Sequence, residues 1–371
     1  MKKMALIFIL LAGLIVPWAC TNSQPTGPLA TYNLTATFTY TFTPTPTNWA
    51  GYTNTPTPKA GTNTATPYSP PPINTATPTS TFVNTSNPSQ ATPVLNGTTW
   101  TTSAPPNGVA YDGSVTIYVA EGTEGSTGGQ IQMFSASGSL FGTMTTYNGS
   151  AAFGQPNGVA YYGGNIYVVD QVNKAVYELT PSGALVHSLT SWAAVSGGPG
   201  SFSSPEGIAV DGSGNVYVAD TANNYIEVFN SALSTTPVAE FNGSASGNIP
   251  FSNPSAVAVD GSGKVYVVDA SNQFVKIFTN NLGTSYSGKF WTAVSADSDI
   301  YGITLDSGKN IYLADSGASQ VEEYSVGGAS FLTSGLGSGP STPDPVGLVF
   351  IGTNNLLVAD YSNNQLYLVT P

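Results

Sequence analysis

The sequence predicts an all-β fold, and three observations support this prediction. Short apolar runs alternate with polar residues through residues 92–371, and Gly, Asn, Asp and Ser separate the runs. The runs recur in six copies with a period of about 45 to 50 residues. Each copy has room for four strands, which describes one blade of a propeller. We therefore predict a six-bladed β-propeller over residues 92–371.

Residues 1–20 have the pattern of an export signal. Two lysines precede a nearly unbroken apolar run, residues 4–16, that is too short to span a bilayer. Cys20, the only cysteine of the chain, follows this run. The segment resembles a bacterial lipoprotein signal, which implies that Cys20 becomes a lipidated N-terminus. Pro17 and Trp18 depart from that pattern, so an ordinary secretion signal or an uncleaved anchor is the alternative.

Residues 21–91 are dominated by Thr, Pro, Asn and Ser, and Lys59 is their only charged residue. Such a segment buries too little apolar surface to offset its chain entropy, so we expect a disordered linker. Its prolines favour polyproline II at about 3.1 Å per residue, which gives a reach on the order of 200 Å. We predict a stalk that carries the propeller. Stalks of this composition can also be O-glycosylated, which the residues do not decide.

Two landmarks recur in the six copies. Each copy opens with an apolar stretch, in most cases as Pro-x-Gly followed by an aliphatic and a small residue. We expect this glycine to allow a sharp turn into the innermost strand. Each second run closes with an acid, and in four copies an Asn follows three residues later, which predicts a side-chain-stabilised turn. The acids are Glu121, Asp170, Asp220, Asp269, Asp315 and Asp360.

The last copy stops at Pro371 after its third run, so its blade lacks an outer strand. Residues 93–100 resemble the outer run of the third copy, residues 237–243. We therefore predict that residues near 93–101 pair with the last blade and close the ring. Without this pairing, an exposed strand edge would invite aggregation.

The repeated pattern resembles the NHL repeat, from about residue 104 to the end of the chain. The third copy, residues 204–229, matches best, and it includes Pro205-Glu206-Gly207-Ile208-Ala209. The resemblance implies an NHL-type propeller. The first copy departs from the pattern at Glu121 and by a Gly-rich insertion, the fourth at Ala256 and the fifth at Ala318, so we expect longer or looser turns there.

Charge and composition argue against several functions. The net charge is −12, the chain has no arginine, and all eight basic residues are lysines, which argues against nucleic acid and phosphorylated ligands. A single histidine, His187, cannot build the multi-histidine zinc site of propeller amidating lyases. Streptogramin-type lyases, which are also propellers, need a catalytic histidine at the channel. His187 falls in a predicted outer strand, where we expect a structural role.

The residue between Pro and Gly opens each innermost strand at the predicted channel mouth. In chain order these positions hold Asn107, Asn157, Glu206, Ser255, Tyr301 and Val346. The arrangement predicts a mouth that is polar on one side. It also resembles lactonases related to gluconolactonases, in which Asn and acidic residues bind a divalent ion. Asn107, Asn157, Glu206 and Ser255 are thus a candidate site for a small ligand or a weakly held Ca²⁺. The alternative is that this repeat position simply faces solvent, varies from blade to blade and binds nothing.

Trp100, Trp192 and Trp291 fall in predicted outer strands or the loops after them. Exposed tryptophans would suit contact with a glycan or a protein. Packing between the blades is the favoured interpretation.

Two functions remain open at this point. The first is an exported, lipid-anchored module of the cell envelope that faces the periplasm or the exterior and binds a protein or glycan ligand. The alternative is a divalent-metal-dependent hydrolase of the lactonase type. The first is favoured, with Ca²⁺ as the only cofactor considered, but a propeller fold hosts both and does not decide.

Overall fold

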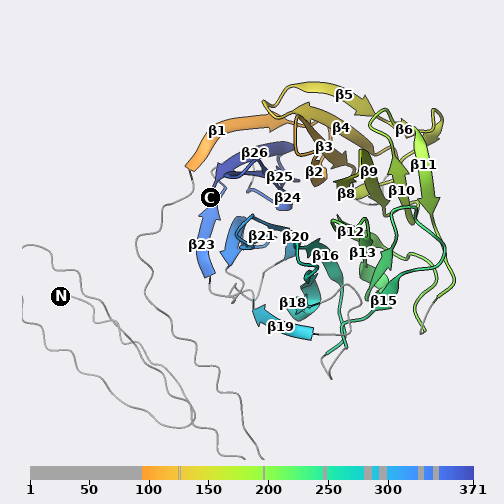
Figure 1. Cartoon of the computed structure of the whole chain (residues 1–371). Helices are drawn as coiled ribbons and strands as arrows, with labels where there is room; N and C mark the ends of the chain where they lie inside the picture. The colour runs from red at the N-terminus through yellow and green to blue at the C-terminus, as the bar shows by residue number, and fades with distance from the viewer. Residues whose placement is uncertain are drawn as a thin grey trace, which may run out of the picture. The chain divides into compact units, whose positions relative to one another are not determined.

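The computed structural model describes residues 94–371, apart from residues 124, 126, 195–196, 245–248, 280–285, 292–298, 325–329 and 337–341. The chain forms six four-stranded antiparallel sheets, and Figure 1 shows them arranged in a ring, so the predicted six-bladed propeller is confirmed. The predicted signal (1–20) and linker (21–91) lie outside the described residues. Within the described part of the chain, no helix is long and apolar enough to cross a membrane.

The first three blades follow one another along the chain. Blade 1 consists of β2 (Pro106–Tyr111), β3 (Thr116–Glu121), β4 (Gln130–Ser135) and β5 (Leu140–Met144). Blade 2 consists of β8 (Pro156–Tyr162), β9 (Asn165–Asp170), β10 (Ala175–Leu179) and β11 (Leu185–Leu189). Blade 3 consists of β12 (Pro205–Val210), β13 (Val216–Asp220), β14 (Tyr225–Phe229) and β15 (Ala239–Phe241). A short hairpin of β6 (Thr146–Tyr147) and β7 (Ala151–Ala152) lies between blades 1 and 2 in sequence.

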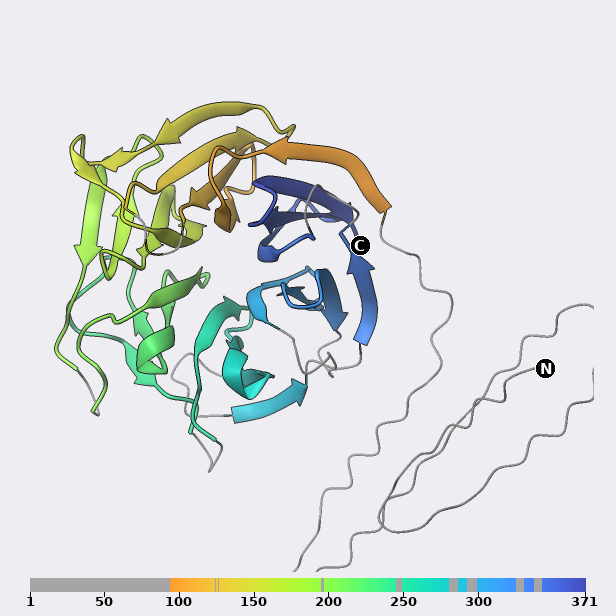
Figure 2. The same cartoon turned by 180° about the vertical axis from the view of Figure 1, so that it is seen from behind.

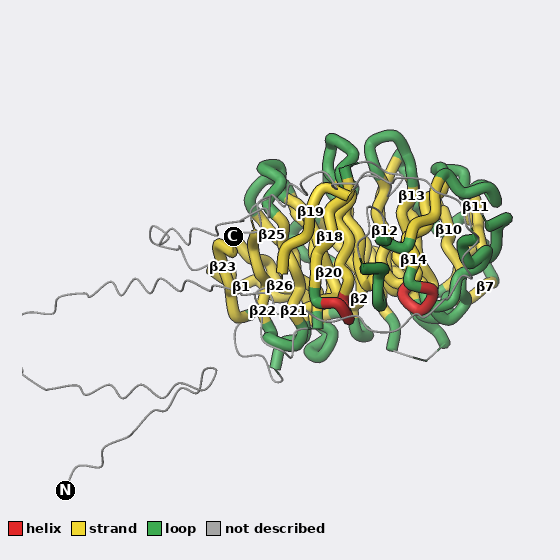
Figure 3. Tube along the Cα trace, turned by 90° about the horizontal axis from the view of Figure 1, so that it is seen from below, coloured by secondary structure: helices red, strands yellow, loops and turns green. Residues whose placement is uncertain are grey.

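The other three blades repeat this order. Blade 4 consists of β16 (Pro254–Val259), β17 (Val265–Asp269), β18 (Phe274–Phe278) and β19 (Tyr286–Trp291). Blade 5 consists of β20 (Ile300–Leu305), β21 (Ile311–Asp315), β22 (Gln320–Tyr324) and β23 (Ser330–Gly335). Blade 6 consists of β24 (Pro345–Ile351), β25 (Asn355–Asp360), β26 (Gln365–Thr370) and, from the other end of the propeller, β1 (Val94–Thr101). Figure 3 shows that the strands run between two faces of the ring, where the loops gather.

The ring closes as predicted. Strand β1 pairs antiparallel with β26, from Val94 opposite Thr370 to Thr101 opposite Gln365. Figure 2 shows this strand as the outer edge of the last blade. Thr102 extends the contact, because its backbone N–H donates to the carbonyl of Asn364 at 2.9 Å. The outer edge of β26 is therefore covered by a strand from the other end of the propeller.

The cores lie between adjacent blades. Trp192 packs between blades 2 and 3, with its ring centre 4.7 Å from that of Phe202 and 5.1 Å from that of Phe229. Trp100 packs between blades 6 and 1 and stacks on Phe134 at 6.1 Å. The prediction that tryptophans pack between blades is confirmed for these two. The side chain of Trp291 lies outside the described residues.

The glycine that opens an innermost strand has a different role from the one predicted. Its φ is not positive, so the left-handed backbone that only glycine adopts readily is not what this position requires. A Cβ on Gly158 would lie 2.5 Å from the carbonyl oxygen of Glu206 in the next blade, and a Cβ on Gly108 would lie 2.4 Å from that of Asn157. These distances are too short for real atoms. The missing side chain therefore lets adjacent innermost strands approach each other closely.

The acids that close the second strands stabilise turns, as predicted, and they also hold the segment that enters the innermost strand. Asp170 accepts from the Asn173 side-chain amide at 2.9 Å and from the backbone N–H groups of Gly154 and Gln155 at 2.8 and 3.0 Å. Asp220 binds Ser203 and Ser204 in the same way. Each acid thereby positions the start of an innermost strand at the mouth of the channel.

The departures from the repeat pattern have unequal effects. The insertion after Glu121 lengthens the connection from β3 to β4, as expected. The connection after Asp315 keeps the four residues found after Asp220, so the expectation of a longer turn is wrong there. The backbone N–H of Ala318 donates to Asp315 at 3.0 Å, and this contact needs no Asn side chain. At Ala256 the pairing of β16 with β17 has the same register shift, after Pro254, that blade 3 has between Pro205 and Gly207.

Candidate functional site: the channel mouth

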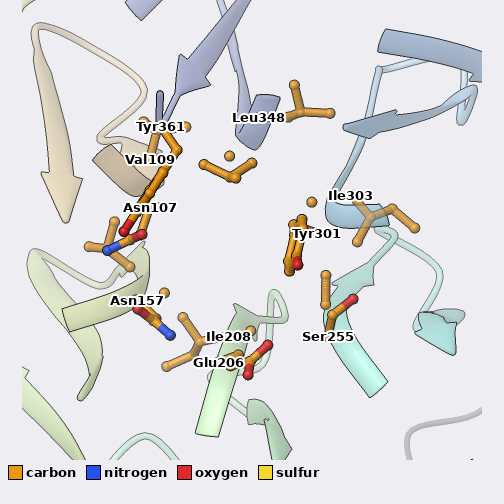
Figure 4. A pocket seen from close by; sticks show the side chains of 18 of the residues that line it. Asn107, Val109, Asn157, Glu206, Ile208, Ser255, Tyr301, Ile303, Leu348 and Tyr361 are labelled. Carbon is orange, nitrogen blue, oxygen red and sulfur yellow. The ribbon is translucent and has the colours of Figure 1, made fainter. Parts of the chain in front are cut away.

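The central channel opens into a cavity of about 400 Å³. The residue between Pro and Gly lines this cavity in all six blades (Figure 4). A β-bulge at this residue interrupts the pairing of every innermost strand with its neighbour. A bulge re-aims a side chain that would otherwise follow the strand alternation, which explains why these six residues meet. The structure thus brings the four predicted site residues together: Asn107, Asn157, Glu206 and Ser255.

The amide of Asn157 is oriented by a chain of hydrogen bonds. The backbone N–H of Gly125 donates to Gln155 Oε1 at 2.9 Å, so the Gln155 amide nitrogen must face the other way. That nitrogen donates to Asn157 Oδ1 at 3.2 Å. Because the Asn157 oxygen is engaged by Gln155, Asn157 presents its nitrogen to the cavity, where Figure 4 shows it.

Asn107 has the opposite orientation. Its amide nitrogen donates to two backbone carbonyls, those of Gly122 at 3.1 Å and Pro156 at 3.2 Å. Its oxygen is therefore the atom left for a ligand. The bond to Pro156 also links blade 1 to blade 2.

Glu206 supplies a carboxylate beside Asn157 (Figure 4). Its Oε1 accepts from the Gln171 amide nitrogen at 3.2 Å, and the same nitrogen donates to Ser204 at 2.7 Å. Gln171 therefore holds Glu206 from blade 2. We call the three side chains of Asn107, Asn157 and Glu206 the polar arc; in chain order they present an acceptor, a donor and an acceptor.

Ser255 belongs to the wall of the cavity. Its side chain is buried, and its hydroxyl donates to the carbonyl of Ile300 in blade 5 at 2.8 Å. Blade 4 has Ala256 in place of the opening glycine, and this hydroxyl links blade 4 to blade 5 at that position. Ser255 thus contributes to the packing of two blades.

The side of the mouth formed by blades 4 to 6, which the repeat positions predict to be the more apolar one, also carries polar residues. Tyr301 is 48% exposed, and Val346 is aliphatic, as the repeat positions indicated. Asp344 and Tyr361 line the same cavity, although the sequence did not single them out. Deeper along the innermost strands, one aliphatic residue from each blade lines the channel: Val109, Val159, Ile208, Val257, Ile303 and Leu348.

A sequence signal for some of the missed residues does exist. Gln171 and Tyr361 each follow the acid that closes a second strand. Because the second strand runs antiparallel to the innermost one, its end lies beside the start of the innermost strand, at the mouth. The position after the closing acid was therefore as informative as the position after the opening proline.

The NHL repeat family matches residues 202–229 and 251–278, which cover most of the strands of blades 3 and 4. The other four blades repeat the same strand order and also close the second strand with a buried acid, which is Glu121 in blade 1 and an aspartate in the others. The propeller is an NHL-repeat propeller. The resemblance seen in the sequence is thereby confirmed for the family, and from here we call residues 94–371 the NHL propeller.

Solved structures resemble the NHL propeller in fold alone. The WD40 β-propeller domain of Doa1 has a TM-score of 0.53 at 13% identity, over 75% of this chain and 96% of that one. A virginiamycin B lyase from Staphylococcus aureus has a TM-score of 0.50 at 11% identity, over 74% of this chain and 98% of that one. A chain of a nidogen/laminin complex has a TM-score of 0.50 at 17% identity, over 65% and 83%. No curated protein matches the sequence.

His187 lies on β11, the outer strand of blade 2, as predicted. Its Nδ1 lies 2.5 Å from Glu178 Oε2, and its side chain is about half exposed. Glu178 also accepts from Asn165 and Tyr167, so the histidine joins a hydrogen-bonded cluster on the outer half of the blade. The residues that line the channel include no histidine.

The donor set of the mouth does not fit a tightly held divalent ion. Among the described residues, no group of three or more His, Cys, Asp or Glu side chains could hold a metal. Of the four predicted ligands only Glu206 is charged, and Ser255 points its hydroxyl at a backbone carbonyl. Calcium sites gain affinity from the number of anionic ligands. A weakly held Ca²⁺ at this mouth stays a prediction.

Proposed function

We propose that the NHL propeller is a non-catalytic binding module that holds its ligand, a protein or a glycan, at the channel mouth. The polar arc carries this proposal. Three side chains from three adjacent blades are held in defined orientations. The carbonyls of Gly122 and Pro156 hold Asn107, Gln155 holds Asn157, and Gln171 holds Glu206. Orienting polar groups in advance lowers the cost of binding, and few pockets on a protein are built this way.

A metal-dependent hydrolase is the weaker of the two functions considered. It would need a firmly bound ion with an acid or base beside it, and the mouth offers a single carboxylate among the predicted ligands. The lyase with a similar fold is too distant in sequence, at 11% identity, to transfer its chemistry. The oriented side chains of the polar arc support binding.

The proposed location is the cell envelope, with a lipid anchor at Cys20. This part rests on the apolar run of residues 4–16 and on the position of Cys20 directly after it. The Thr- and Pro-rich residues 21–91 would then act as the stalk that presents the propeller to its ligand.

The test is capture of an envelope component by the full-length protein and by two variants. Tyr301→Ala removes an exposed aromatic ring at the mouth, whereas Phe141→Ala removes one that is 61% exposed on the outer strand β5. We expect solubilised envelope proteins and polysaccharides to contain a ligand that binds the wild type and Phe141→Ala but not Tyr301→Ala. Capture that survives Tyr301→Ala would show that the ligand binds elsewhere on the propeller.

A further inference from the structure

We infer that the channel mouth binds the terminal residue of a neutral glycan, end-on, through its vicinal hydroxyl groups. This inference rests on the proposed function and names its ligand class. It draws on the order of donors and acceptors, the charge of the cavity, two tyrosines and the shape of the wall.

The polar arc matches neighbouring hydroxyl groups. Asn107 presents an acceptor, Asn157 a donor and Glu206 an acceptor, each from the next blade around the ring. A hydroxyl group both donates and accepts, so a pair of adjacent hydroxyls can bridge all three side chains. A ligand with acceptors only would face the oxygens of Asn107 and Glu206 with no hydrogen to donate to them, so it would bind less well than a ligand with hydroxyl groups.

The charge of the cavity selects against anionic ligands. Glu206 and Asp344 line it, and none of the described residues that line it is basic. The protein carries a net charge of −12, so the surrounding field has the same sign. Uronic acids, sialic acids and phosphorylated sugars would therefore be repelled, whereas neutral sugars would not.

Two tyrosines flank the polar arc. Going around the ring, Tyr361 of blade 6 precedes Asn107, and Tyr301 follows Ser255 (Figure 4). Tyr301 keeps its side chain 48% exposed although such a ring is normally packed. An aromatic face offers a flat apolar contact, which suits the C–H face of a sugar ring whose hydroxyls engage polar groups at its edge.

The shape of the wall favours the end of a chain over its middle. All six blades contribute residues to the wall, so the described residues enclose the cavity from every blade of the ring. A volume of about 400 Å³ lies at the small end of the range for ligand pockets. One terminal sugar residue fits these limits better than a peptide strand, which needs a free sheet edge or a groove.

The test uses an array of oligosaccharides with neutral and acidic termini, probed with the full-length protein. We expect binding to one class of neutral terminal sugar and at least tenfold weaker binding to acidic termini. The methyl glycoside of the selected sugar should compete. Asn157→Asp is nearly isosteric but replaces the donor with an acceptor, so it should weaken binding by at least tenfold. Tyr301→Ala should weaken binding about tenfold and Tyr301→Phe by less than threefold.

Phe141→Ala is the control, because it removes an exposed aromatic ring on the outer strand β5, away from the mouth. It should leave the affinity within about twofold of the wild type. Equal binding of acidic termini, or an unchanged affinity for Asn157→Asp, would overturn the sugar inference. If no sugar binds but a protein is captured in a Tyr301-dependent manner, the sugar inference fails and mouth binding stands. If neither occurs, both fail.

Discussion

At the scale of single residues, the spacing of the blades depends on a hydrogen atom in place of a side chain. Gly108, Gly158, Gly207, Gly302 and Gly347 each face a carbonyl oxygen of the next innermost strand, at distances where a Cβ would not fit. The same carbonyls belong to the residues that line the mouth. The close approach of the blades and the geometry of the site are therefore set by the same contacts.

Replacing one of these glycines should destabilise the propeller. Gly158→Ala would place a Cβ 2.5 Å from the backbone oxygen of Glu206, and backbone yields less readily than a side chain. We expect a loss of roughly 1 to 3 kcal/mol in the free energy of unfolding, measured by urea denaturation. Gly212→Ala is the control, since nothing lies within 4 Å of its Cβ position. Equal stability of the two variants would contradict the role given to Gly158.

Calcium tests the one charged residue of the polar arc. A bound ion stabilises the folded state by mass action, so a real site would raise the melting temperature. Only one of the predicted ligands is a carboxylate, so a site here would be weak, and we expect millimolar Ca²⁺ to raise the melting temperature of the wild type by a small amount. Glu206→Gln should remove this rise while leaving the stability of the metal-free protein nearly unchanged. No effect of Ca²⁺ on the wild type would mean that the resemblance to the lactonases fails and that these residues are ordinary rim positions.

At the scale of elements, the middle of each third strand faces the acid that closes the second strand. In β18 this position is Lys276, which pairs with Asp269 at 2.7 Å, both buried. In β14 this position is Glu227, which lies near the closing acid Asp220, and in β22 it is Glu322, which lies near Asp315. Two buried acids therefore lie close together in each of these blades. Burial, followed by the nearby Asp220, raises the pKa of Glu227 well above its usual range. The blades share one backbone plan but differ in the charge of their interiors.

Glu322 makes this difference measurable as a pH dependence. Burial, and to a lesser degree the neighbouring Asp315, raises its pKa to about 7 from 4.5. The folded state therefore holds a proton that the unfolded state releases between these values, so stability falls as the pH rises from about 4.5 to 7. The contribution is at most about 3 kcal/mol. Unfolding free energies across this range should fall less steeply for Glu322→Gln; parallel slopes would mean that Glu322 is ionised when folded.

The closing strand β1 offers a second prediction at this scale. Without it, β26 would present an unpaired edge, and the space filled by Trp100 against Phe134 would be open. A chain that starts at residue 104 should therefore melt clearly below one that starts at residue 90, and it should aggregate more readily. Thermal unfolding followed by circular dichroism, with light scattering, compares the two. Identical melting temperatures would show that closure contributes little to stability.

At the scale of the whole molecule, the proposal joins an anchor, a stalk and a propeller. The anchor rests on Cys20, the only cysteine of the chain. Cys20→Ser should abolish labelling by a radioactive or clickable fatty acid and release the protein from the membrane fraction. Ser23→Ala, beyond both the apolar run and Cys20, controls for general damage to export. A Cys20→Ser protein that stays with the membrane would point to a retained apolar helix as the anchor.

The repeats by themselves determined the architecture. Six copies with alternating apolar runs specify strands, and a period near 45 to 50 residues leaves room for four of them in each blade. The closing strand followed from the missing fourth run of the last copy. Even the meeting of Asn107, Asn157 and Glu206 was predictable, because equivalent positions of a closed ring of repeats lie around one axis.

Only the tertiary structure decided what these residues do. The opening glycine serves a close contact between blades, and a contact between residues some fifty positions apart leaves no local pattern. The orientations of Asn107 and Asn157 depend on Gly125, Gln155 and the Pro156 carbonyl. Ser255, identical in repeat position, turns its hydroxyl into the wall. Position around the axis follows from the repeat, but the direction of a donor follows from neighbours that the fold brings together.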